Sequence, residues 1–330
     1  MKKYSIGVDL GGTKVLAAVV EKSTGKVVAE NKKKTKGERG NEQITKVLLK
    51  TIKSLLKESG IDKDKISSIG IGAAGQVDRE HGILINGPNL ECQILDLKDI
   101  VEQAFDIPTY VGNDVEVAAI GELHFGAGRG YKDISCIFVG TGIGSSIIKN
   151  GKIHYGASGT AGEIGHIIVD LNGRACGCGA NGCLEAYASR TAIESRILGA
   201  IKKGRKSIIT DLTGPSCSIS TKHIKQSLDA HDEVVEQYVK EAIEYFSGGL
   251  ATVMNFYNPE LIILGGGVID SIDEFYLKAI KIARIKALPI PSIKTIFKKA
   301  ELGDYSGVIG AALLKNQFDL QRRDKCLIHS

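Results

Sequence analysis

Hydrophobic and polar positions along the chain alternate between strand-like and helix-like spacing. Apolar runs closed by turn residues predict strands at Tyr4–Asp9 and Val15–Val20, with a third at Val27–Ala29. An apolar residue recurs every three to four positions from Ile44 to Leu56, which predicts an amphipathic helix. Strands that alternate with such helices are typical of α/β proteins.

The opening pattern returns in the middle of the chain. It consists of an apolar strand, a glycine turn and two further strands, predicted at Ile134–Val139, Gly140–Gly144, Ser146–Ile148 and Lys152–Tyr155. Thr13 and Thr141 occupy similar places in the two glycine turns. The repeat favours two related lobes over a solenoid, with two unrelated hairpins as the alternative.

The remaining elements follow from the same spacing rules. Further strands are predicted at Ile66–Ile71, Thr109–Val111 and Leu261–Leu264, and helices at Leu97–Phe105, 184–201, Asp232–Phe256 and Val308–Phe318. The helix over Asp232–Phe256 is expected to break at Gly248-Gly249, because glycine weakens a helix interior. Residues 202–220 are polar and show no clear period.

Composition narrows the class of protein. The chain has 330 residues, 43% of them hydrophobic and 25% charged, which is typical of a soluble protein of about two domains. No apolar run approaches the ~18 residues of a membrane span, and the chain enters a strand at once, so we expect no transmembrane segment and no cleavable signal. The net charge of +5 is dispersed, which argues against a nucleic-acid partner. Seven cysteines without an export signal favour metal binding or free thiols in a cytoplasmic protein.

Three glycine-rich turns are candidates for nucleotide binding. Asp9-Leu10-Gly11-Gly12-Thr13-Lys14 has a backbone that a phosphate can approach, and an acid at the strand end that could hold Mg²⁺. Its residues do not follow the order of a P-loop, and a hairpin turn without a bound phosphate is the alternative interpretation. Gly140-Thr141-Gly142 has the same chemistry, and Gly265-Gly266-Gly267 leaves room for a flat ligand. Together the three turns suggest a nucleoside triphosphate held between two lobes.

A cysteine cluster is the most specific signal in the sequence. Cys176, Cys178 and Cys183 follow His166 within a glycine-rich segment, and a Cys₃His set is a preferred ligand set for structural zinc. Buried free thiols and a redox pair at Cys176 and Cys178 are the alternatives, and His154 is the alternative nitrogen ligand. The other cysteines are expected to be apolar fillers, at Cys92, Cys136, Cys217 and Cys326.

Carboxylates at three places are candidate catalytic or sugar-binding groups. Asn113-Asp114 follows a strand, where a carboxylate could accept a hydroxyl proton during phosphoryl transfer. The alternative is an Asx turn or the cap of a helix that begins near Val115. Glu163 and Glu185 flank the cysteine cluster and could bind sugar hydroxyls, with surface solvation as the alternative.

In this order, these segments resemble the ROK (repressor, open reading frame, kinase) family of sugar kinases. The resemblance covers Ser5 to about Leu314 and is carried by Asp9–Lys14, Gly112–Asp114, Gly140–Gly144, Ala161–His166, Cys176–Glu185 and Leu264–Gly267. The chain departs from the family at three places. Ala74 stands where proline often precedes the glycine equivalent to Gly75, no tryptophan follows Asn89-Leu90, and Ser145-Ser146 stands where glycines are frequent.

The resemblance implies the actin-like ATPase fold, with two RNase-H-like lobes and ATP in a central cleft. The N-terminal lobe would comprise residues 1–115, joined by a C-terminal helix at 306–323. The C-terminal lobe would comprise residues 116–305 and carry a structural zinc loop at 166–183. A homodimer or homotetramer is expected on the same basis.

The resemblance also implies a role for each motif. Asp114 corresponds in position to the catalytic base, and the sugar ligands would be Asn113, Glu163, His166, Glu185 and Gly75. His166 would bind zinc through one ring nitrogen and the sugar through the other. The phosphates of ATP would lie on Gly11, Gly12, Thr13, Lys14, Gly140, Thr141 and Gly142, with Mg²⁺ near Asp9, and the adenosine near Gly265, Gly266 and Gly267.

We therefore expect an ATP-dependent kinase that phosphorylates the 6-hydroxyl of a hexose, with glucose as the first choice. N-acetylmannosamine, N-acetylglucosamine and fructose are alternative substrates, and polyphosphate is an alternative donor. A non-catalytic sugar sensor of the same family is disfavoured by Asp114 and by a first strand at about residue 4, which leaves no room for a DNA-binding helix-turn-helix. A zinc dehydrogenase is disfavoured because its glycine fingerprint is missing. We expect no membrane partner.

Overall fold

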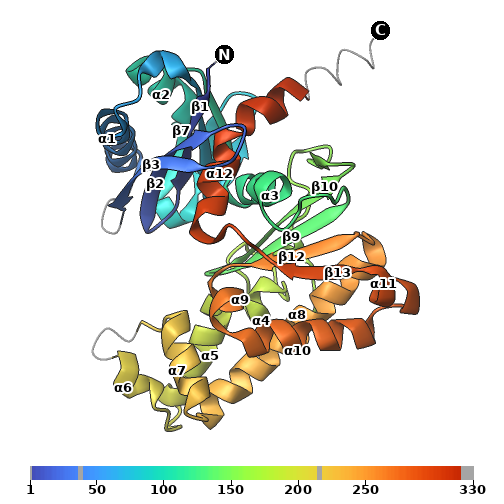
Figure 1. Cartoon of the computed structure of the whole chain (residues 1–330). Helices are drawn as coiled ribbons and strands as arrows, with labels where there is room; N and C mark the ends of the chain where they lie inside the picture. Colours follow the sequence, from blue (N-terminus) through green and yellow to red (C-terminus); the bar gives the residue numbers. More distant parts are fainter. Residues whose placement is uncertain (1, 36–39, 214–217, 321–330) are drawn as a thin grey trace. The chain divides into compact units, whose positions relative to one another are not determined.

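The computed structural model describes residues 2–35, 40–213 and 218–320. The chain divides into two compact units (Figure 1): one runs to Gly130 and resumes at Glu301, and the other is Tyr131–Ala300. The boundary expected at residue 115 falls inside helix α3 (Asp114–Phe125), which belongs to the first unit because it packs on α12 (Ser306–Ala312). The helix expected over 306–323 has a turn at Leu313 and is helical again over 314–320, and its last three residues lie outside the described part.

The first unit is built on a five-stranded sheet. Its order is β3-β2-β1-β4-β8, in which β2 is antiparallel to β1 and β3, whereas β1, β4 and β8 are parallel. The strands are β1 (Tyr4–Leu10), β2 (Lys14–Glu21), β3 (Val27–Lys34), β4 (Ile66–Ala73) and β8 (Thr109–Asn113). The unit also contains helices α1 (Asn41–Ser59) and α2 (Leu97–Phe105). It has short 3₁₀ turns at Lys63–Lys65, Pro88–Leu90 and Gly303–Tyr305.

The predicted apolar face of α1 is buried, with Ile44, Leu48, Ile52 and Leu55 in the core of this unit. On the other elements, glycine permits close backbone contact. A Cβ on Gly7 in β1 would lie 1.8 Å from the carbonyl oxygen of Val308, and one on Gly310 would lie 1.6 Å from that of Val117. Helix α12 therefore touches both the sheet and α3 through bare backbone, which joins the C-terminal segment to the N-terminal one.

A second, three-stranded sheet was not predicted from the sequence. It consists of β5 (Gln76–Asp78), β6 (Ile83–Gly87) and β7 (Cys92–Asp96), all antiparallel, between β4 and α2. These strands are only three to five residues long and mix apolar with polar positions, so they lack the longer apolar runs from which spacing predicts a strand.

The second unit repeats the architecture of the first. Its sheet has the order β11-β10-β9-β12-β13, with the same pattern of antiparallel and parallel pairs. The strands are β9 (Ile134–Val139), β10 (Ile143–Lys149), β11 (Lys152–Ile153), β12 (Leu261–Gly265) and β13 (Ile296–Lys299). The predicted repeat is thus confirmed at the level of sheet topology.

Helices α4 to α11 belong to this unit. They are α4 (Glu185–Ala188), α5 (Arg190–Lys202), α6 (Ile209–Thr213), α7 (Thr221–Asp229), α8 (Glu233–Phe256), α9 (Gly267–Ser271), α10 (Asp273–Lys286) and α11 (Pro289–Lys294), with a 3₁₀ turn at Ile164–His166. The break expected in α8 at Gly248-Gly249 is wrong, since the helix is continuous. A Cβ on Gly249 would lie 2.5 Å from Cδ2 of Leu184, so this glycine serves close packing.

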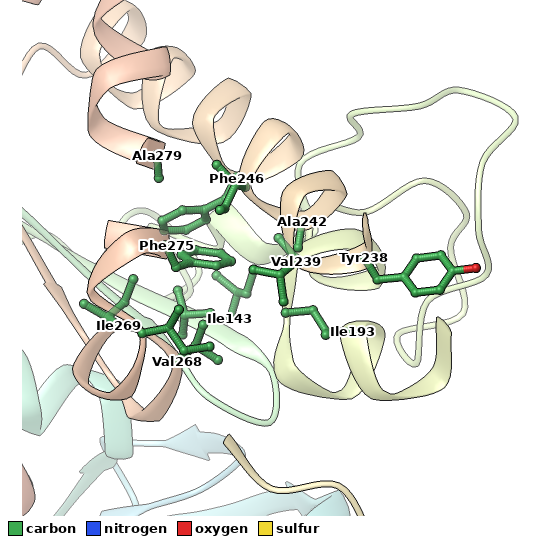
Figure 2. Close-up of a cluster of buried hydrophobic side chains, with 14 of the residues drawn as sticks. Ile143, Ile193, Tyr238, Val239, Ala242, Phe246, Val268, Ile269, Phe275 and Ala279 are labelled. Carbon is green, nitrogen blue, oxygen red and sulfur yellow. The ribbon is translucent and has the colours of Figure 1, made fainter. Parts of the chain in front are cut away.

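The core of the second unit lies between α8, α9, α10 and the sheet. Figure 2 shows the rings of Phe246 and Phe275 next to each other, with Val268 and Ile269 of α9 nearby. The two ring centroids are 5.5 Å apart and the ring planes are tilted by 45°. The hydroxyl of Tyr238 points away from this cluster. Among the described residues, none of the helices combines the length and the apolar character needed to cross a bilayer.

Candidate active site

The turn between β1 and β2 places Asp9 beside a bare stretch of backbone. The amide of Gly11 donates to the carbonyl oxygen of Lys14 at 3.0 Å, which closes a hairpin turn. A Cβ on Gly12 would lie 2.9 Å from the carbonyl oxygen of Asn89, so a side chain would clash there. The turn is therefore the hairpin of the alternative interpretation, in which Gly12 packs against Asn89.

Two carboxylates of the first unit interact at this turn. Burial raises the pKa of Asp114 to about 6, and the negative charge of Asp9 adds to the increase. Burial also raises the pKa of Asp9, while the nearby Lys14 opposes the increase. Nζ of Lys14 forms an ion pair with Asp304 at 3.1 Å. A carboxylate with a pKa close to neutrality is suited to exchange a proton at physiological pH.

Asn113 ends β8 and caps α3. Its Oδ1 accepts hydrogen bonds from the amides of Val115 at 2.9 Å and Glu116 at 3.3 Å, and its Nδ2 donates to the carbonyl oxygen of Gly75 at 3.0 Å. The helix-cap interpretation is therefore correct for Asn113. Asp114 is the first residue of α3, and its Oδ1 accepts from the amide of Val115 at 3.0 Å. The cap thereby fixes the position of Asp114 at the end of the sheet.

An ion pair that the sequence did not indicate supports the start of α3. Nη1 of Arg79 lies 3.1 Å from Oε2 of Glu116, and both side chains are largely buried. Arg79 follows β5, one of the strands that spacing failed to predict. A lone arginine and a lone glutamate 37 positions apart carry no local signal, so only the fold could reveal the pair.

Four side chains of the kinds that can hold a metal ion converge in the second unit. The ligand atoms of His166, Cys176, Cys178 and Cys183 all lie within 4.8 Å of one another. Sγ of Cys176 is 3.8 Å from Nδ1 of His166, and Sγ of Cys178 is 3.6 Å from Sγ of Cys183. Tetrahedral zinc, with bonds of ~2.0–2.3 Å, requires ligand atoms about 3.5–3.8 Å apart. The four groups fit such an ion, and His166 rather than His154 is the histidine of the set.

The segment that carries the cysteines is held by its own backbone. Isolated bridges pair Ile168 with Cys183 and Ala175 with Asn181. Gly182 has φ +80°, and a Cβ there would lie 1.8 Å from the carbonyl oxygen of Asp170. Burial raises the pKa of Cys183 to about 12, so a bound cation is what would stabilise its thiolate.

The two other cysteines that the structure describes, Cys92 and Cys136, have no part in this cluster. Cys92 and Cys136 are buried in the first and second units, as expected of apolar fillers. Burial raises the pKa of Cys92, which makes it a poor nucleophile. Cys217 and Cys326 lie outside the described residues.

Glu185 links the cysteine cluster to the second glycine turn. Its Oε2 accepts a hydrogen bond from the amide of Ile143 at 2.7 Å, and its Oε1 lies 3.9 Å from Sγ of Cys176. A Cβ on Gly142 would lie 2.3 Å from Oε2, so a side chain at this position would displace the carboxylate of Glu185. Glu185 is therefore a built-in part of the site and not a solvated surface residue.

Glu163 lies in the same group of charges. Burial raises the pKa of Glu163, His166 lowers it, and Glu185 raises it again. These three side chains are brought together from the 3₁₀ turn at Ile164–His166 and the start of α4. The carboxylates and the imidazole that the sequence singled out around the cysteines therefore form one cluster.

The second glycine turn is held by α5. The amide of Arg190 donates to the carbonyl oxygen of Gly140 at 2.9 Å, and its Nη2 donates to Oγ1 of Thr141 at 3.2 Å. Nη1 of Arg190 is paired with Glu194 at 2.9 Å. A Cβ on Gly140 would meet nothing within 4 Å, so one side of the turn is open. Sequence reasoning missed Arg190, because a single arginine at a helix start has no distinguishing pattern.

The third glycine run joins β12 to α9. Gly265 ends the strand and Gly267 begins the helix. Gly266 has φ +90°, and a Cβ there would lie 2.7 Å from the carbonyl oxygen of Val139. A Cβ on Gly267 would lie 3.7 Å from Oγ1 of Thr221, in ordinary contact. The run thus forms a sharp strand-to-helix turn at the carboxyl end of the central strands, where α/β proteins commonly bind ligands.

The motifs and their arrangement match a known family. The sequence pattern of the ROK family matches residues 5–317. The chain belongs to the ROK family. One relative, the glucokinase of Halalkalibacterium halodurans, is 32% identical over 318 residues, covering 96% of each chain.

Solved ROK structures share the fold of this chain. A ROK family glucokinase from Streptomyces griseus, in complex with glucose and AMPPNP, matches with a TM-score of 0.80 and 34% identity over 94% of this chain and 98% of that one. A ROK family transcriptional regulator matches with a TM-score of 0.83 and 26% identity over 96% of this chain and 78% of that one. The expected actin-like ATPase fold is confirmed by these ROK neighbours.

Proposed function

We propose that this ROK protein is a glucokinase, which transfers the γ-phosphoryl group of ATP to the 6-hydroxyl of glucose. The observation that carries the proposal is the Asp114 carboxylate, fixed at the start of α3 and close enough to Asp9, near the end of β1, for the two charges to interact. The similarity to the glucokinase of Halalkalibacterium halodurans and to the Streptomyces griseus enzyme, which holds glucose and AMPPNP, supports this choice of substrate and donor.

Asp114 is proposed to accept the proton of the attacking hydroxyl. A pKa of about 6 leaves the carboxylate mostly ionised at pH 7, while it remains basic enough to take a proton as the oxygen attacks phosphorus. The hydrogen bond from the amide of Val115 holds Oδ1 of this carboxylate at 3.0 Å, and Oδ2 is proposed to face the sugar. Asn113 positions this base through the helix cap and, with Gly75, lines the proposed sugar site.

The phosphates of ATP are proposed to lie against the two glycine turns, at Gly11 to Lys14 and at Gly140 to Gly142. Mg²⁺, when bound near Asp9, would neutralise charge on the transferred group. Gly265, Gly266 and Gly267 are the proposed contact for adenosine, because their bare backbone at the end of β12 admits a flat group.

The remaining sugar ligands are proposed to come from the cysteine cluster. Nδ1 of His166 faces the sulfur of Cys176, which leaves Nε2 for a sugar hydroxyl. Bound Zn²⁺ would hold the imidazole in this orientation. Glu163 is proposed to bind a second hydroxyl, and the Oε1 side of Glu185 a third, since its Oε2 is committed to the amide of Ile143.

Thiols and zinc thiolates persist in a reducing compartment, so we propose a cytoplasmic enzyme that supplies glucose 6-phosphate to glycolysis. A sugar-sensing role is the second candidate, favoured by the structural match to a ROK transcriptional regulator. The two functions differ in turnover, because a sensor binds the sugar without consuming the donor.

The test measures ADP release from the purified full-length chain with glucose, fructose, mannose, N-acetylglucosamine and N-acetylmannosamine. Product analysis by NMR then locates the phosphate, and a polyphosphate arm tests the donor. Glucose is expected to give the highest kcat/KM, with phosphate on its 6-hydroxyl. Sugar binding without ADP release would support the sensor, and a higher kcat/KM for another hexose would replace glucose as the substrate.

A further inference from the structure

The four side chains that could hold a metal ion come from two parts of the second unit. His166 ends a 3₁₀ turn, and Cys183 directly precedes the N-cap of α4. Cys176 and Cys178 lie instead on a short loop, which we name the cysteine loop and define as residues 174–182. A tetrahedral site therefore requires that this loop keep its place relative to the other two ligands.

Hydrogen bonds within the cysteine loop connect its parts to one another. The amide of Cys176 donates to the carbonyl oxygen of Ala180 at 2.8 Å, and the amide of Gly179 donates to that of Cys176 at 3.0 Å. The two ends are also joined, since the amide of Gly182 donates to the carbonyl oxygen of Arg174 at 2.7 Å. A contact that fixes Arg174 therefore helps to fix the whole loop, including its cysteines.

The hydroxyl of Tyr187 makes such a contact. Its oxygen accepts a hydrogen bond from the amide of Arg174 at 2.9 Å, and the hydroxyl donates to Oδ2 of Asp170 at 2.9 Å. A Cβ on Gly173 would lie 2.0 Å from this oxygen, so glycine leaves room for the hydroxyl. Burial raises the pKa of Tyr187, so the hydroxyl keeps the proton that it donates. It therefore holds the start of the cysteine loop against α4.

The ring of Tyr187 is itself held on two sides. Its centroid lies 4.0 Å from that of Tyr245 in α8, and the guanidinium carbon of Arg174 lies 4.3 Å from it. Nη2 of Arg174 pairs with Glu241, which is also part of α8. Tyr187 is only 4% exposed, and α4 packs against α8. The position of the hydroxyl is therefore set by a packed ring.

Helix α4 connects this contact to the candidate site. Glu185 is its first residue and accepts a hydrogen bond from the amide of Ile143, while Cys183 lies just before its N-cap. Tyr187 therefore joins the two cysteines of the loop to a ligand and a carboxylate at the start of the same helix. Partners that orient metal ligands in this way commonly change metal affinity about 10–100-fold.

We propose that Tyr187 is a positioning residue for zinc. Its hydroxyl holds the cysteine loop close enough to His166 and Cys183 for all four ligands to share one ion. Without the hydroxyl, the amide of Arg174 and the carboxylate of Asp170 lose their shared partner, and the loop loses its attachment to α4. Because Tyr187 acts here only through the metal ligands, this role rests on the proposed zinc site.

The test measures the zinc affinity of the purified full-length chain by competition with a colorimetric chelator, pyridylazoresorcinol. Tyr187→Phe removes the hydroxyl and keeps the ring, and it is expected to bind zinc about 10–100-fold more weakly than wild type. Tyr245→Phe is the matched control. It removes a hydroxyl from the neighbouring ring and leaves the contact between Tyr187 and Arg174 in place, so its zinc affinity should equal that of wild type.

A second readout separates positioning from a general loss of stability. At low free zinc, Tyr187→Phe should have a higher KM for glucose and a nearly unchanged kcat, because His166 is a proposed sugar ligand. Excess zinc should restore the wild-type KM, since mass action refills a weakened site. A raised KM that excess zinc leaves unchanged would contradict the role of Tyr187.

The outcomes distinguish this role from the proposals on which it rests. Zinc binding in Tyr187→Phe as tight as in wild type overturns the positioning role and leaves the zinc site intact, whereas a wild-type chain that binds no zinc overturns both. Weaker zinc binding in Tyr187→Phe supports the role even if the chain releases no ADP, a result that would reject only the proposed kinase. If melting curves show that Tyr187→Phe does not fold, Asp170→Ala replaces it, since it removes the acceptor of the same hydroxyl. Weaker zinc binding in Asp170→Ala would support the role, and wild-type affinity would overturn it.

Discussion

Replacing Asp114 with asparagine should make this protein more stable and almost inactive. The carboxylate is held where water is scarce and a second carboxylate, Asp9, is near, so its ionised form is disfavoured in the folded state. Asparagine has nearly the same shape and can still accept the hydrogen bond from the amide of Val115. The substitution therefore removes an unfavourable charge while it leaves the helix start in place.

The magnitude follows from the pKa values of the folded and unfolded states. A change in pKa from 3.8 to about 6 corresponds to about 3 kcal/mol. Between these values the folded chain keeps a proton that the unfolded chain has lost, so wild-type stability falls as pH rises through this window. Asp114→Asn does not lose stability in this pH window. Its free energy of unfolding should therefore exceed that of wild type by about 3 kcal/mol at pH 8 and by about half of that at pH 5.

The measurement is a pair of melting curves, wild type and Asp114→Asn, at pH 8 and pH 5. At about 2–4 °C per kcal/mol, the variant should melt roughly 6–12 °C higher at pH 8, with a smaller difference at pH 5. ADP release should fall by roughly 10²–10⁴-fold, the usual contribution of a positioned base. Asp62→Asn is the matched control, since the hydrogen bond from Lys65 lowers the pKa of Asp62 and its removal should not stabilise the fold.

Two results would refute this reasoning. If Asp114→Asn melts at or below the wild-type temperature at pH 8, the carboxylate does not carry the unfavourable charge. If the variant turns over glucose at a near-normal rate, Asp114 is not the base. The two readouts are separate, so the electrostatic argument and the catalytic one can fail independently.

Three further predictions address the remaining parts of the site. In a pH–rate profile, kcat/KM for glucose should fall below about pH 6, because the proposed base Asp114 becomes protonated. Asp9→Asn should move the midpoint of this fall to lower pH, because the charge of Asp9 raises the pKa of Asp114. An unchanged midpoint in Asp9→Asn would contradict the prediction. Gly142→Ala should weaken AMPPNP binding about tenfold by calorimetry, since its Cβ would meet a carboxylate at 2.3 Å, whereas Gly140→Ala, with open space, should change it less than twofold. Elemental analysis should find close to one zinc per chain in wild type and in Cys92→Ser and under half in Cys183→Ser; less than half a zinc in wild type would reject the metal site.

Local chemistry made much of the protein predictable. The strand, glycine turn and strand units depend on residues that are neighbours in the chain, and so does the amphipathic helix at Ile44–Leu56. The cysteine cluster was predictable because thiolates and an imidazole at short spacing have few other uses. Family membership followed from the same motifs, since their residue types and order are specific.

Long-range contacts were not predictable, because they depend on where separate elements meet. Spacing could not show that Gly249 serves close packing and leaves α8 unbroken, or that α3 packs on a helix almost two hundred residues later. It also could not show that the Glu185 carboxylate binds the amide of Ile143, or that burial and Asp9 together raise the pKa of Asp114. The sequence alone determined which chemical groups the protein has and how each short segment folds. Tertiary structure decided which of those groups share a neighbourhood, because burial and charge interactions exist only between residues that folding brings together.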